Sequence, residues 1–237
     1  MEIVVFILCT MIGSFINVIA YSLPRQLDFI YRRSFCDCCS HELSFVDMVP
    51  ILSFILLKGK CRYCHYKINM RYSIIELLCG IIGVLIYRLY DPIIFFIMFL
   101  FFIIIILISL IDIDTMYVYD EMIILLFIVS LFLYPHFQIS FIERIIGMLI
   151  LSIPMFLFNI YKEAFGGGDI KLFCVLGLLF GIQGILCIFI YAAFFASFYS
   201  FFMIFNHKIE MNSYIPFVPF IGFGVFCYII FGNIFVI

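Results

Sequence analysis

Long apolar runs separated by short polar breaks dominate this chain and give the first prediction about its fold. Several of these runs reach the roughly 20 apolar residues that a helix needs to cross a bilayer. The pattern predicts eight membrane-spanning helices, over residues 1–23, 73–90, 93–111, 121–134, 141–161, 170–183, 185–205 and 214–235. The sixth helix is expected to be short and to be broken by Gly177 and Gly181.

One long polar segment, residues 24–72, interrupts the apolar pattern. Within it, the stretch from Ser44 to Leu57 is amphipathic and suited to lie on a membrane surface. We therefore divide the chain into a first helix (1–23), a polar loop (24–72) and a core of seven helices (73–237). The predicted fold class is an all-α polytopic membrane protein with about eight transmembrane helices and one large loop between helices 1 and 2.

Composition and charge exclude a soluble domain and orient the helices. The 237 residues are 67% hydrophobic and 12% charged, with a mean hydropathy of +1.30, whereas a soluble domain is about half apolar. Eight of the 13 Lys and Arg residues lie between Arg25 and Arg71. Since positive charge stays on the cytoplasmic side, the loop is predicted to be cytoplasmic and both termini to lie outside. Only Arg88 and Arg144 fall outside.

The first apolar run precedes its positive charges, which is the reverse of a cleavable signal peptide. We therefore expect it to be retained as the first transmembrane helix. The surroundings predicted for these helices are the lipid bilayer, and no nucleic-acid partner is expected.

The polar loop contains two C-x-x-C steps, Cys36/Cys39 and Cys61/Cys64. Four thiolates at this spacing are typical of a structural zinc site, in which each step offers two sulfurs to one tetrahedral ion. A redox dithiol relay and a loop without metal are the alternatives, although a cytoplasmic location argues against disulfides. Cys38 could replace a neighbour as ligand. The histidines that follow, His41 and His65, are expected at the surface or beside the ligands.

Acidic residues gather where two apolar runs end on the predicted cytoplasmic side. Asp112, Asp114, Asp120 and Glu121 follow the third run, and Asp169 begins the sixth. A carboxylate at a membrane edge is costly and is usually kept for function. For Asp114, Asp120 and Glu121, a solvated helix cap is the simpler interpretation. Asp112 comes directly after the apolar run and is therefore expected to be the deeper group.

The acid at position 169 follows three glycines, Gly166 to Gly168, which let the chain turn tightly and let another segment come close. We predict that Asp112 and Asp169 meet. Two carboxylates that approach closely share one proton, and such a pair can activate water and protonate a leaving group. Nothing in the sequence favours a nucleophilic enzyme, because there is no G-x-S-x-G motif and the four histidines are scattered. No H-E-x-x-H motif is present for a catalytic metal.

Gly13, Ser14 and Asn17 place small and polar groups within the first predicted helix. Helix–helix packing through Gly13 and Ser14 is one interpretation. A role for Asn17 in lining a site is the other, and the sequence does not choose between them.

Taken together and in this order, the motifs resemble those of the bacterial type IV prepilin peptidases, which are membrane aspartyl proteases. The resemblance covers nearly the whole chain. It includes Gly13-Ser14-Phe15 with Asn17, the cysteine loop with Pro50, Ser53 and Gly59, Arg71-Tyr72 with Glu76, Asp112-x-Asp114 with Asp120, Gly166-x-Gly168-Asp169-x-Lys171-Leu172, and Pro216-Phe217 with Pro219-Phe220.

The resemblance implies an enzyme of the bacterial cytoplasmic (inner) membrane that cleaves prepilin or pseudopilin leaders after a glycine, on the cytoplasmic side. It places the catalytic aspartates at Asp112 and Asp169, with Gly166, Gly168, Lys171, Asp114 and Asp120 in support. Many family members also methylate the new N-terminal residue with S-adenosylmethionine, and the cysteine loop belongs to that bifunctional form. Asn17, Arg71 and Glu76 are implied as contributors to substrate or methyl-donor binding.

One departure from the family pattern is Tyr119, which stands where a proline is usual and leaves the shape of that turn open. Two other functions remain as alternatives. One is an intramembrane protease of the presenilin kind, which also uses G-x-G-D but lacks the cysteine loop. The other is a non-enzymatic, zinc-clipped membrane assembly protein or transporter whose aspartates bind protons or ions.

Overall fold

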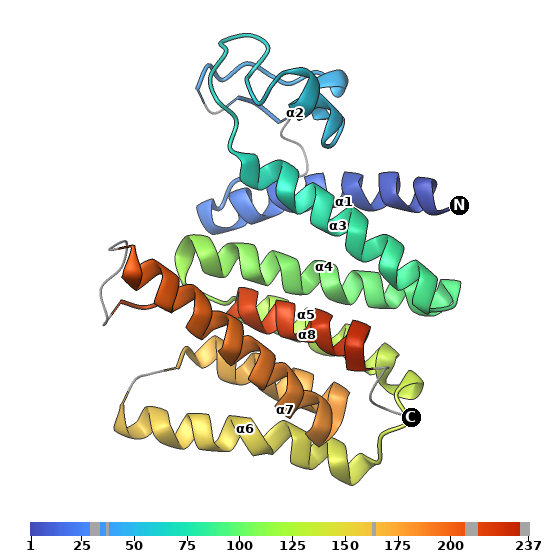
Figure 1. The fold of residues 1–237 in the computed structure, drawn as a ribbon, viewed down its shortest axis with the longest axis vertical. Helices are drawn as coiled ribbons and strands as arrows, with labels where there is room; N and C mark the ends of the chain where they lie inside the picture. The colour runs from blue at the N-terminus through green and yellow to red at the C-terminus, as the bar shows by residue number, and fades with distance from the viewer. Residues whose placement is uncertain (29–33, 37, 163–164, 207–212, 233–237) are drawn as a thin grey trace. The chain divides into compact units, whose positions relative to one another are not determined.

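The computed structural model describes residues 1–28, 34–36, 38–162, 165–206 and 213–232, and these residues are helical apart from turns, loops and two isolated β-bridges (Figure 1). The α-helices are α1 (Glu2–Ser22), α2 (Leu52–Leu56), α3 (Met70–Leu89), α4 (Pro92–Thr115), α5 (Asp120–Leu133), α6 (Phe141–Tyr161), α7 (Gly167–Phe205) and α8 (Val218–Gly232). Three short 3₁₀ helices are η1 (Leu23–Arg25), η2 (Phe45–Met48) and η3 (Tyr134–His136).

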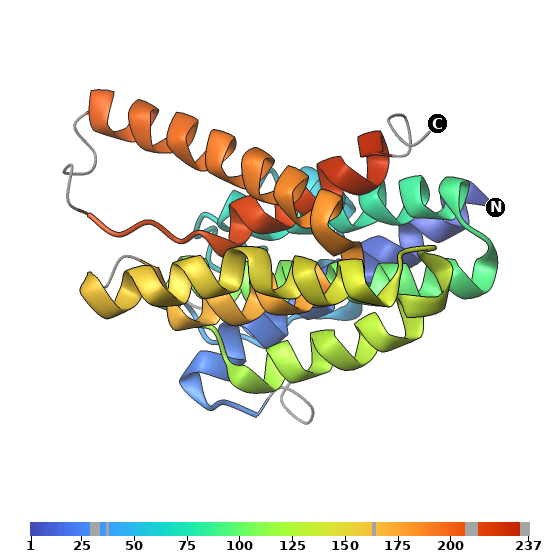
Figure 2. The ribbon, with the colours of Figure 1, turned by 90° about the horizontal axis from the view of Figure 1, so that it is seen from below.

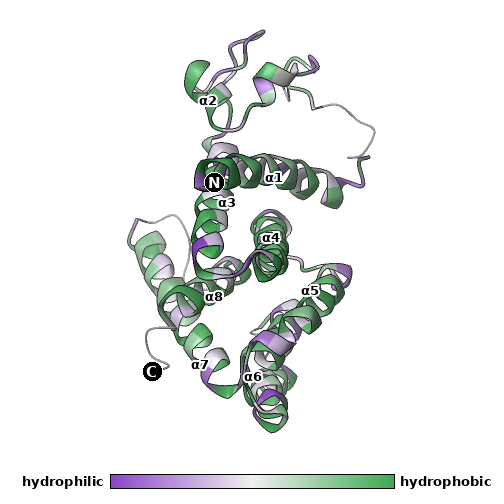
Figure 3. Cartoon of the chain, turned by 90° about the vertical axis from the view of Figure 1, so that its right-hand side faces the viewer, coloured by the Kyte–Doolittle hydropathy of each residue, from purple (hydrophilic) through white to green (hydrophobic). Residues whose placement is uncertain are grey.

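Five segments of the described chain are long and apolar enough to cross a membrane: Glu2–Arg25, α3, α4, α6 and α7. A shorter apolar helix spans Val218–Phe231. Hydrophobic residues cover these helices, whereas hydrophilic residues concentrate in the loop that carries α2 and at helix ends (Figure 3). The all-helical class predicted from the apolar runs is therefore confirmed.

The chain forms two compact units, residues 1–103 and 104–237. In the first unit, α1 and α3 pack closely because small residues line their contact. A Cβ added to Gly13 would meet the Cβ of Cys79 at 2.9 Å, and one added to Gly80 would meet the Thr10 side chain at 2.7 Å. Gly13 is therefore a packing residue, as one of the two interpretations of this stretch predicted.

The stretch from Ser44 to Leu57 is not one continuous amphipathic element. It contains the separate short helices η2 and α2, divided by Ile51, whose backbone adopts a left-handed conformation with φ of 61°. A β-branched residue rarely adopts this conformation. The break means that α2 is only five residues long, and a membrane-surface position for this stretch stays a prediction.

In the second unit, α6 and α7 approach so closely that their backbones touch. A Cβ added to Gly147 would lie 2.7 Å from the carbonyl oxygen of Gly177. Gly177 therefore does not break the helix, contrary to the prediction, and serves instead as a point of close helix contact. The break lies only at Gly181, where φ is 65° and ψ is −167°.

The second half of α7 turns away from the first half at Gly181 (Figure 2). The ring of Phe173 in the first half lies 5.8 Å from the ring of Phe189 in the second. In one straight helix these two positions would be about 24 Å apart along the axis. The two halves thus correspond to the separate helices predicted over 170–183 and 185–205.

Candidate functional site

Asp112 lies in the last turn of α4 and is 5% exposed. The helix was predicted to end at residue 111 but continues to Thr115, whose hydroxyl donates a hydrogen bond to the carbonyl oxygen of Ile111 (2.8 Å). The Asp112 Oδ2 accepts a hydrogen bond from the backbone N–H of Val218 (3.1 Å), the first residue of α8. A carboxylate is stabilised at a helix N-terminus because the free N–H groups and the helix dipole both favour negative charge.

Asp169 lies in the first turn of α7, where Gly166 is the N-cap residue. Its carboxylate receives the backbone N–H of Gly166, and a Cβ added to Gly166 would lie 3.1 Å from its Oδ2. This arrangement resembles half of a capping box, in which an acid at the third helical position reaches back to the N-cap amide. The glycine therefore leaves room for the carboxylate to fold back over the start of the helix.

The carboxyl groups of Asp112 and Asp169 interact electrostatically within the second unit. They come from helices far apart in the sequence, and each is held by a backbone N–H at a helix start. Two carboxyl groups in this relation can hold one proton between them and present one ionised oxygen to water.

Two further contacts hold the start of α7 against the segment between α4 and α5. A Cβ added to Gly168 would lie 2.5 Å from the Cβ of Val118, so only glycine allows this approach. Lys171 Nζ lies 2.6 Å from Asp120 Oδ1, which joins the first turns of α7 and α5. Gly168, Lys171 and Asp120 thus shape the approach to Asp169 from neighbouring elements.

The residues between the two helices also fit this geometry. Tyr119 is the N-cap of α5 with φ of −73°, which is close to the value of about −65° that a proline would impose. The tyrosine therefore keeps the backbone conformation that the family's usual proline would give. Asp114 is exposed and lies two residues after Asp112, in the last turn of α4. Glu121 is exposed at the start of α5.

Asn159, in the last turns of α6, was not predicted from the sequence to have any role. Its side-chain amide donates to the carbonyl oxygen of Phe165 (2.6 Å) and accepts from the Phe165 N–H (2.9 Å). This double hydrogen bond fixes the residue that directly precedes Gly166. The only sequence signal was a polar side chain near the end of an apolar run, which is common at helix ends.

The second candidate centre is the cysteine cluster in the first unit. The Sγ atoms of Cys36, Cys39, Cys61 and Cys64 all lie within 4.8 Å of one another, and the Cys36 and Cys64 sulfurs are 3.7 Å apart. A tetrahedral zinc ion with Zn–S bonds of about 2.3 Å separates its sulfurs by about 3.8 Å. The four thiols therefore fit a zinc ion.

The cluster is built from the same short turn used twice. An isolated β-bridge pairs Phe35 with Glu42 around the first cysteine step, and another pairs Lys60 with Lys67 around the second. In both turns the residue after the second cysteine has a positive φ, 56° at Ser40 and 57° at His65. The repeat gives each cysteine of one step an equivalent in the other.

The repeated turn shows which cysteines point to the centre. Cys38 is the third residue of its step and corresponds to Tyr63, which has no thiol. Its side chain is exposed, and it is not part of the four-thiol group. The backbone N–H of Cys39 is directed at the Cys36 sulfur and lowers the pKa of the Cys36 thiol to about 7, which favours the thiolate that a metal requires.

Asn17, Glu76 and Arg71 also lie in the first unit. Asn17 is 7% exposed and donates from its side-chain amide to the carbonyl oxygen of Tyr72 (3.1 Å), at the start of α3. Glu76 is 8% exposed and accepts the backbone N–H of Ile51 (2.8 Å), the residue with the left-handed backbone. Arg71 is half-buried in the first turn of α3. Asn17 thus joins α1 to the start of α3. Glu76 joins the polar loop, at Ile51, to α3.

Comparison with known families divides the chain close to the border of the two units. Residues 7–90 match the family described as Bacterial Peptidase A24 N-terminal domain, and residues 98–201 match the Type IV leader peptidase family. The first match contains the cysteine cluster, and the second contains both Asp112 and Asp169.

Curated relatives resemble the chain over most of its length. A protein of Vibrio cholerae named "Prepilin leader peptidase/N-methyltransferase" is 32% identical over 83% of this chain and 84% of its own. Proteins with the same name from Bacillus subtilis and Aeromonas salmonicida are 27% and 26% identical, each over 97% of this chain and over 94% and 90% of their own length. No solved structure matches the chain significantly. The chain belongs to the type IV prepilin leader peptidase family.

Proposed function

We propose that this protein is a prepilin leader peptidase and that Asp112 and Asp169 carry out the hydrolysis. The observation that supports this most strongly is that the two carboxyl groups, from α4 and α7, lie near enough for the charge of Asp112 to act on Asp169. Each of them also faces a backbone N–H at the start of a helix, Val218 for Asp112 and Gly166 for Asp169. The names of the curated relatives agree with this activity.

In the proposed reaction the aspartate pair shares one proton. The ionised oxygen takes a proton from a water molecule, which attacks the carbonyl carbon of the scissile peptide bond, and the protonated carboxyl group gives its proton to the leaving amine. No covalent enzyme intermediate forms. Lys171 and Asp120 keep the first turns of α7 and α5 together, while Asn159 fixes the backbone before Gly166.

We place the chain in the bacterial inner membrane with eight spans, both termini outside and the aspartates on the cytoplasmic side. The break at Gly181 supports counting α7 as two spans, and α5 and α8 are the two short ones. Reporter fusions after residues 28, 91, 117, 137, 165 and 213 test this arrangement. The expected signals, in that order, are inside, outside, inside, outside, inside and inside, because the two halves of α7 bring the chain back to the side on which α7 began.

We also propose that Cys36, Cys39, Cys61 and Cys64 hold a structural zinc ion. Bound there, zinc would cross-link the two turns by coordination and stabilise a loop with little apolar core. Metal analysis of protein purified without chelator is expected to give one zinc per chain. Protein that carries no metal, while its thiols titrate as free, would refute the proposal.

Methyl transfer to the new N-terminal residue, with S-adenosylmethionine as donor, is proposed on the names of the relatives and on the presence of the cysteine loop. Asn17, Arg71 and Glu76 are proposed to serve this reaction or substrate binding. Their hydrogen bonds to Tyr72 and Ile51 favour a positioning role for Asn17 and Glu76. A methyl-labelled donor and a cleaved precursor, followed by mass analysis of the product's first residue, test this part separately.

The peptidase itself is tested with detergent-solubilised protein and a precursor that contains a basic leader, Gly, Phe and an apolar helix. The wild type is expected to cut after the glycine, and Asp112→Asn or Asp169→Asn is expected to reduce the rate by about 10³-fold or more. Asp91→Asn, which alters an exposed carboxylate in the turn before α4, is the matched control. Normal cleavage by either of the two site variants would refute the role of that residue.

A further inference from the structure

A groove of about 550 Å³ runs along the second half of α7. Its floor consists of the small residues Ala193, Ala196, Ser197 and Ser200. Their spacing places them on one face of the helix. Both hydroxyls are turned back onto their own helix, Ser197 to the carbonyl oxygen of Ala193 (2.7 Å) and Ser200 to that of Ala196 (2.6 Å). The floor is therefore narrow and effectively apolar.

Two of the rings that line the groove belong to residues next in sequence to those that bind the aspartates. Phe217 precedes Val218, whose N–H binds Asp112, and Phe165 precedes Gly166, whose N–H binds Asp169. A ligand seated in the groove would therefore contact Phe165 and Phe217, the residues that directly precede Gly166 and Val218.

The walls of the groove are also packed on the helix that carries Asp169. Phe173, one turn after Asp169, is fully buried. Its ring lies 5.8 Å from that of Phe189 and 6.2 Å from that of Phe217, both of which line the groove. Two rings of the groove are therefore in direct contact with the helix that carries Asp169.

The chemistry of the groove decides which part of a prepilin it suits. The described residues that line it are Phe, Ala, Ser and Ile, so the lining offers no acidic partner for a basic leader. Small residues on an exposed face are typical of helix–helix contact in membranes, because they let two backbones approach closely. From Ala193 to Ile204 the part of α7 that lines the groove extends about 17 Å along the helix axis. This length is enough for three turns of a partner helix.

We propose that this groove binds the apolar segment of the precursor that directly follows the scissile bond, seated as a helix against Ala193, Ala196 and Ser200. The inference rests on the proposed peptidase function and adds the surface that selects the substrate. The segment's first residue would meet Phe165 and Phe217, and the bond before it would lie at the aspartate pair.

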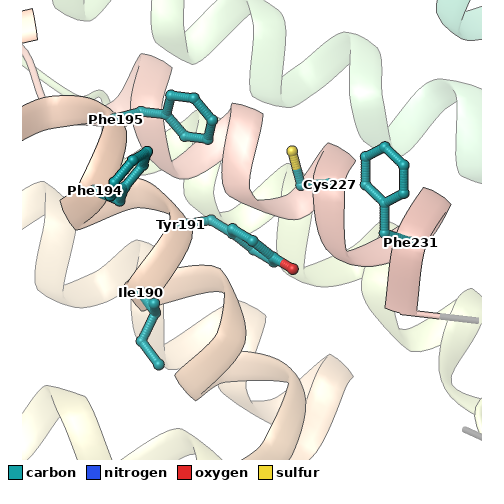
Figure 4. Close-up of a pocket in the computed structure, with 6 residues that line it drawn as sticks. All are labelled: Ile190, Tyr191, Phe194, Phe195, Cys227 and Phe231. Carbon is teal, nitrogen blue, oxygen red and sulfur yellow. The ribbon is translucent and has the colours of Figure 1, made fainter. Parts of the chain in front are cut away.

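A second hollow on α7 provides a control surface. It has a volume of about 430 Å³ and lies between the second half of α7 and α8, where the rings of Tyr191, Phe194 and Phe195 stand near Cys227 and Phe231 (Figure 4). Its lining contains none of the floor residues of the groove, and Ile190 at its edge is 64% exposed. A ring added at Ile190 therefore changes the same helix one turn before the floor begins, at a residue that does not line the groove.

The test compares Ala196→Phe/Ser200→Phe with Ile190→Phe on two substrates that share leader and cleavage site. One is the complete precursor, and in the other a short polar tail replaces the apolar helix. For the complete precursor we expect the double variant to raise KM by about tenfold or more, since added rings block close helix approach. On the tail substrate it should stay within about twofold of wild type. Ile190→Phe should behave as wild type on both.

The outcomes separate the two proposals. If the wild type cleaves neither substrate, the peptidase function fails. If the wild type is active and the double variant has a wild-type KM for the complete precursor, the groove proposal is overturned while the function stands.

A crosslink covers the case in which the double variant does not fold. A precursor with a benzophenone side chain five residues after the scissile bond is irradiated with the Asp112→Asn enzyme, which keeps the native groove. A crosslink to residues 193–204 supports the proposal. Crosslinks only to other segments, to lipid or to a second enzyme molecule overturn it.

Discussion

The four thiols of the proposed metal centre come from two short turns between residues 36 and 64, whereas the two aspartates come from α4 and α7, and Asp112 depends on a third helix, α8, for a hydrogen bond. Each cysteine step brings its own sulfurs together through local backbone geometry. The aspartates can be brought together only by the packing of several helices. One centre is therefore made by local sequence, and the other is made by the tertiary fold.

This difference predicts that the two centres fail independently. A change in a cysteine turn should disturb metal binding while the helices of the second unit remain packed. A change in helix packing should disturb hydrolysis while the metal stays bound. The predictions below test this separation, from the largest expected effect to the smallest.

Replacing Cys61 by Ser removes one of the four thiolates from a buried position, since Cys61 is 4% exposed. A structural zinc site with three sulfurs and a hydroxyl binds far more weakly. We expect bound zinc to fall from one per chain to near zero, measured by metal analysis after gel filtration. Cleavage of a precursor should continue, and its complete loss with an intact helical spectrum would contradict the separation.

The next largest effect is expected in the second unit at Arg144, which is 1% exposed. Its guanidinium donates hydrogen bonds to the carbonyl oxygens of Ile139, Tyr134, Phe137, Leu178 and Leu179. It also lies over the Tyr134 ring at 3.9 Å. The side chain thus ties the turn between α5 and α6 to the carbonyl end of the first half of α7.

Arg144→Met should leave these carbonyl groups without their donor and destabilise the second unit by about 3 kcal/mol. Thermal unfolding in detergent measures the effect. Arg88→Met is the matched control, because Arg88 is an exposed arginine paired with exposed Glu2 and should change the transition little. Zinc content should be unchanged in both variants. Equal unfolding temperatures for the two variants would show that the buried network is not stabilising.

These two arginines also show what could not be predicted from the sequence. The charge rule left both on the outer side as exceptions, and it could not say how each was accommodated. Arg88 finds a carboxylate 86 positions earlier in the chain, and Arg144 finds carbonyl groups on η3, the following turn and α7. Such partners are set by helix packing, which residue patterns do not encode.

The sequence predicted that Asp112 and Asp169 pair, because the lengths of the apolar runs set the depth of each acid, and this pairing stays a prediction. It did not predict that α4 continues through Asp112 to Thr115 or that Val218 donates to this carboxylate. It also missed Asn159, whose contact with Phe165 depends on where the end of α6 lies relative to the following turn. In the cysteine loop, spacing alone was sufficient for the four ligands but left Cys38 open.

A smaller effect is expected for Asp47, which braces the second cysteine turn. Its carboxylate accepts from the Ser44 hydroxyl (2.6 Å) and from Arg62 Nε (2.7 Å), the residue after Cys61. Burial alone would raise the pKa of Asp47, but the bonds from Ser44 and Arg62 outweigh it and hold this pKa below its ordinary value. The ionised form therefore stabilises the loop above the unfolded pKa of about 4, and this contribution is lost as pH falls through the folded pKa.

Asp47→Asn should speed zinc release to a chelator by less than about tenfold at pH 7, because it removes a supporting contact and no ligand. The ratio of variant to wild-type rates should stay constant from pH 7 to pH 5, where Asp47 remains ionised in the folded protein. Ser44→Ala removes one hydrogen-bond donor to the Asp47 carboxylate and serves as an intermediate case. A ratio that collapses within this pH range would contradict the lowered pKa.

The smallest effect is predicted for Cys38→Ser. This variant tests whether the repeated turn, rather than the mere presence of a nearby cysteine, decides which thiols bind the metal. Cys38 occupies the position of Tyr63 in the second turn, is exposed, and is not part of the four-thiol group. We expect one zinc per chain and unchanged release to a chelator. Cys39→Ser, one residue along, should lose the metal as Cys61→Ser does. Loss of zinc in Cys38→Ser with retention in Cys39→Ser would mean that the first turn binds metal in a different register from the second. The two halves of the centre would then not be equivalent, and local sequence would not be sufficient to build it.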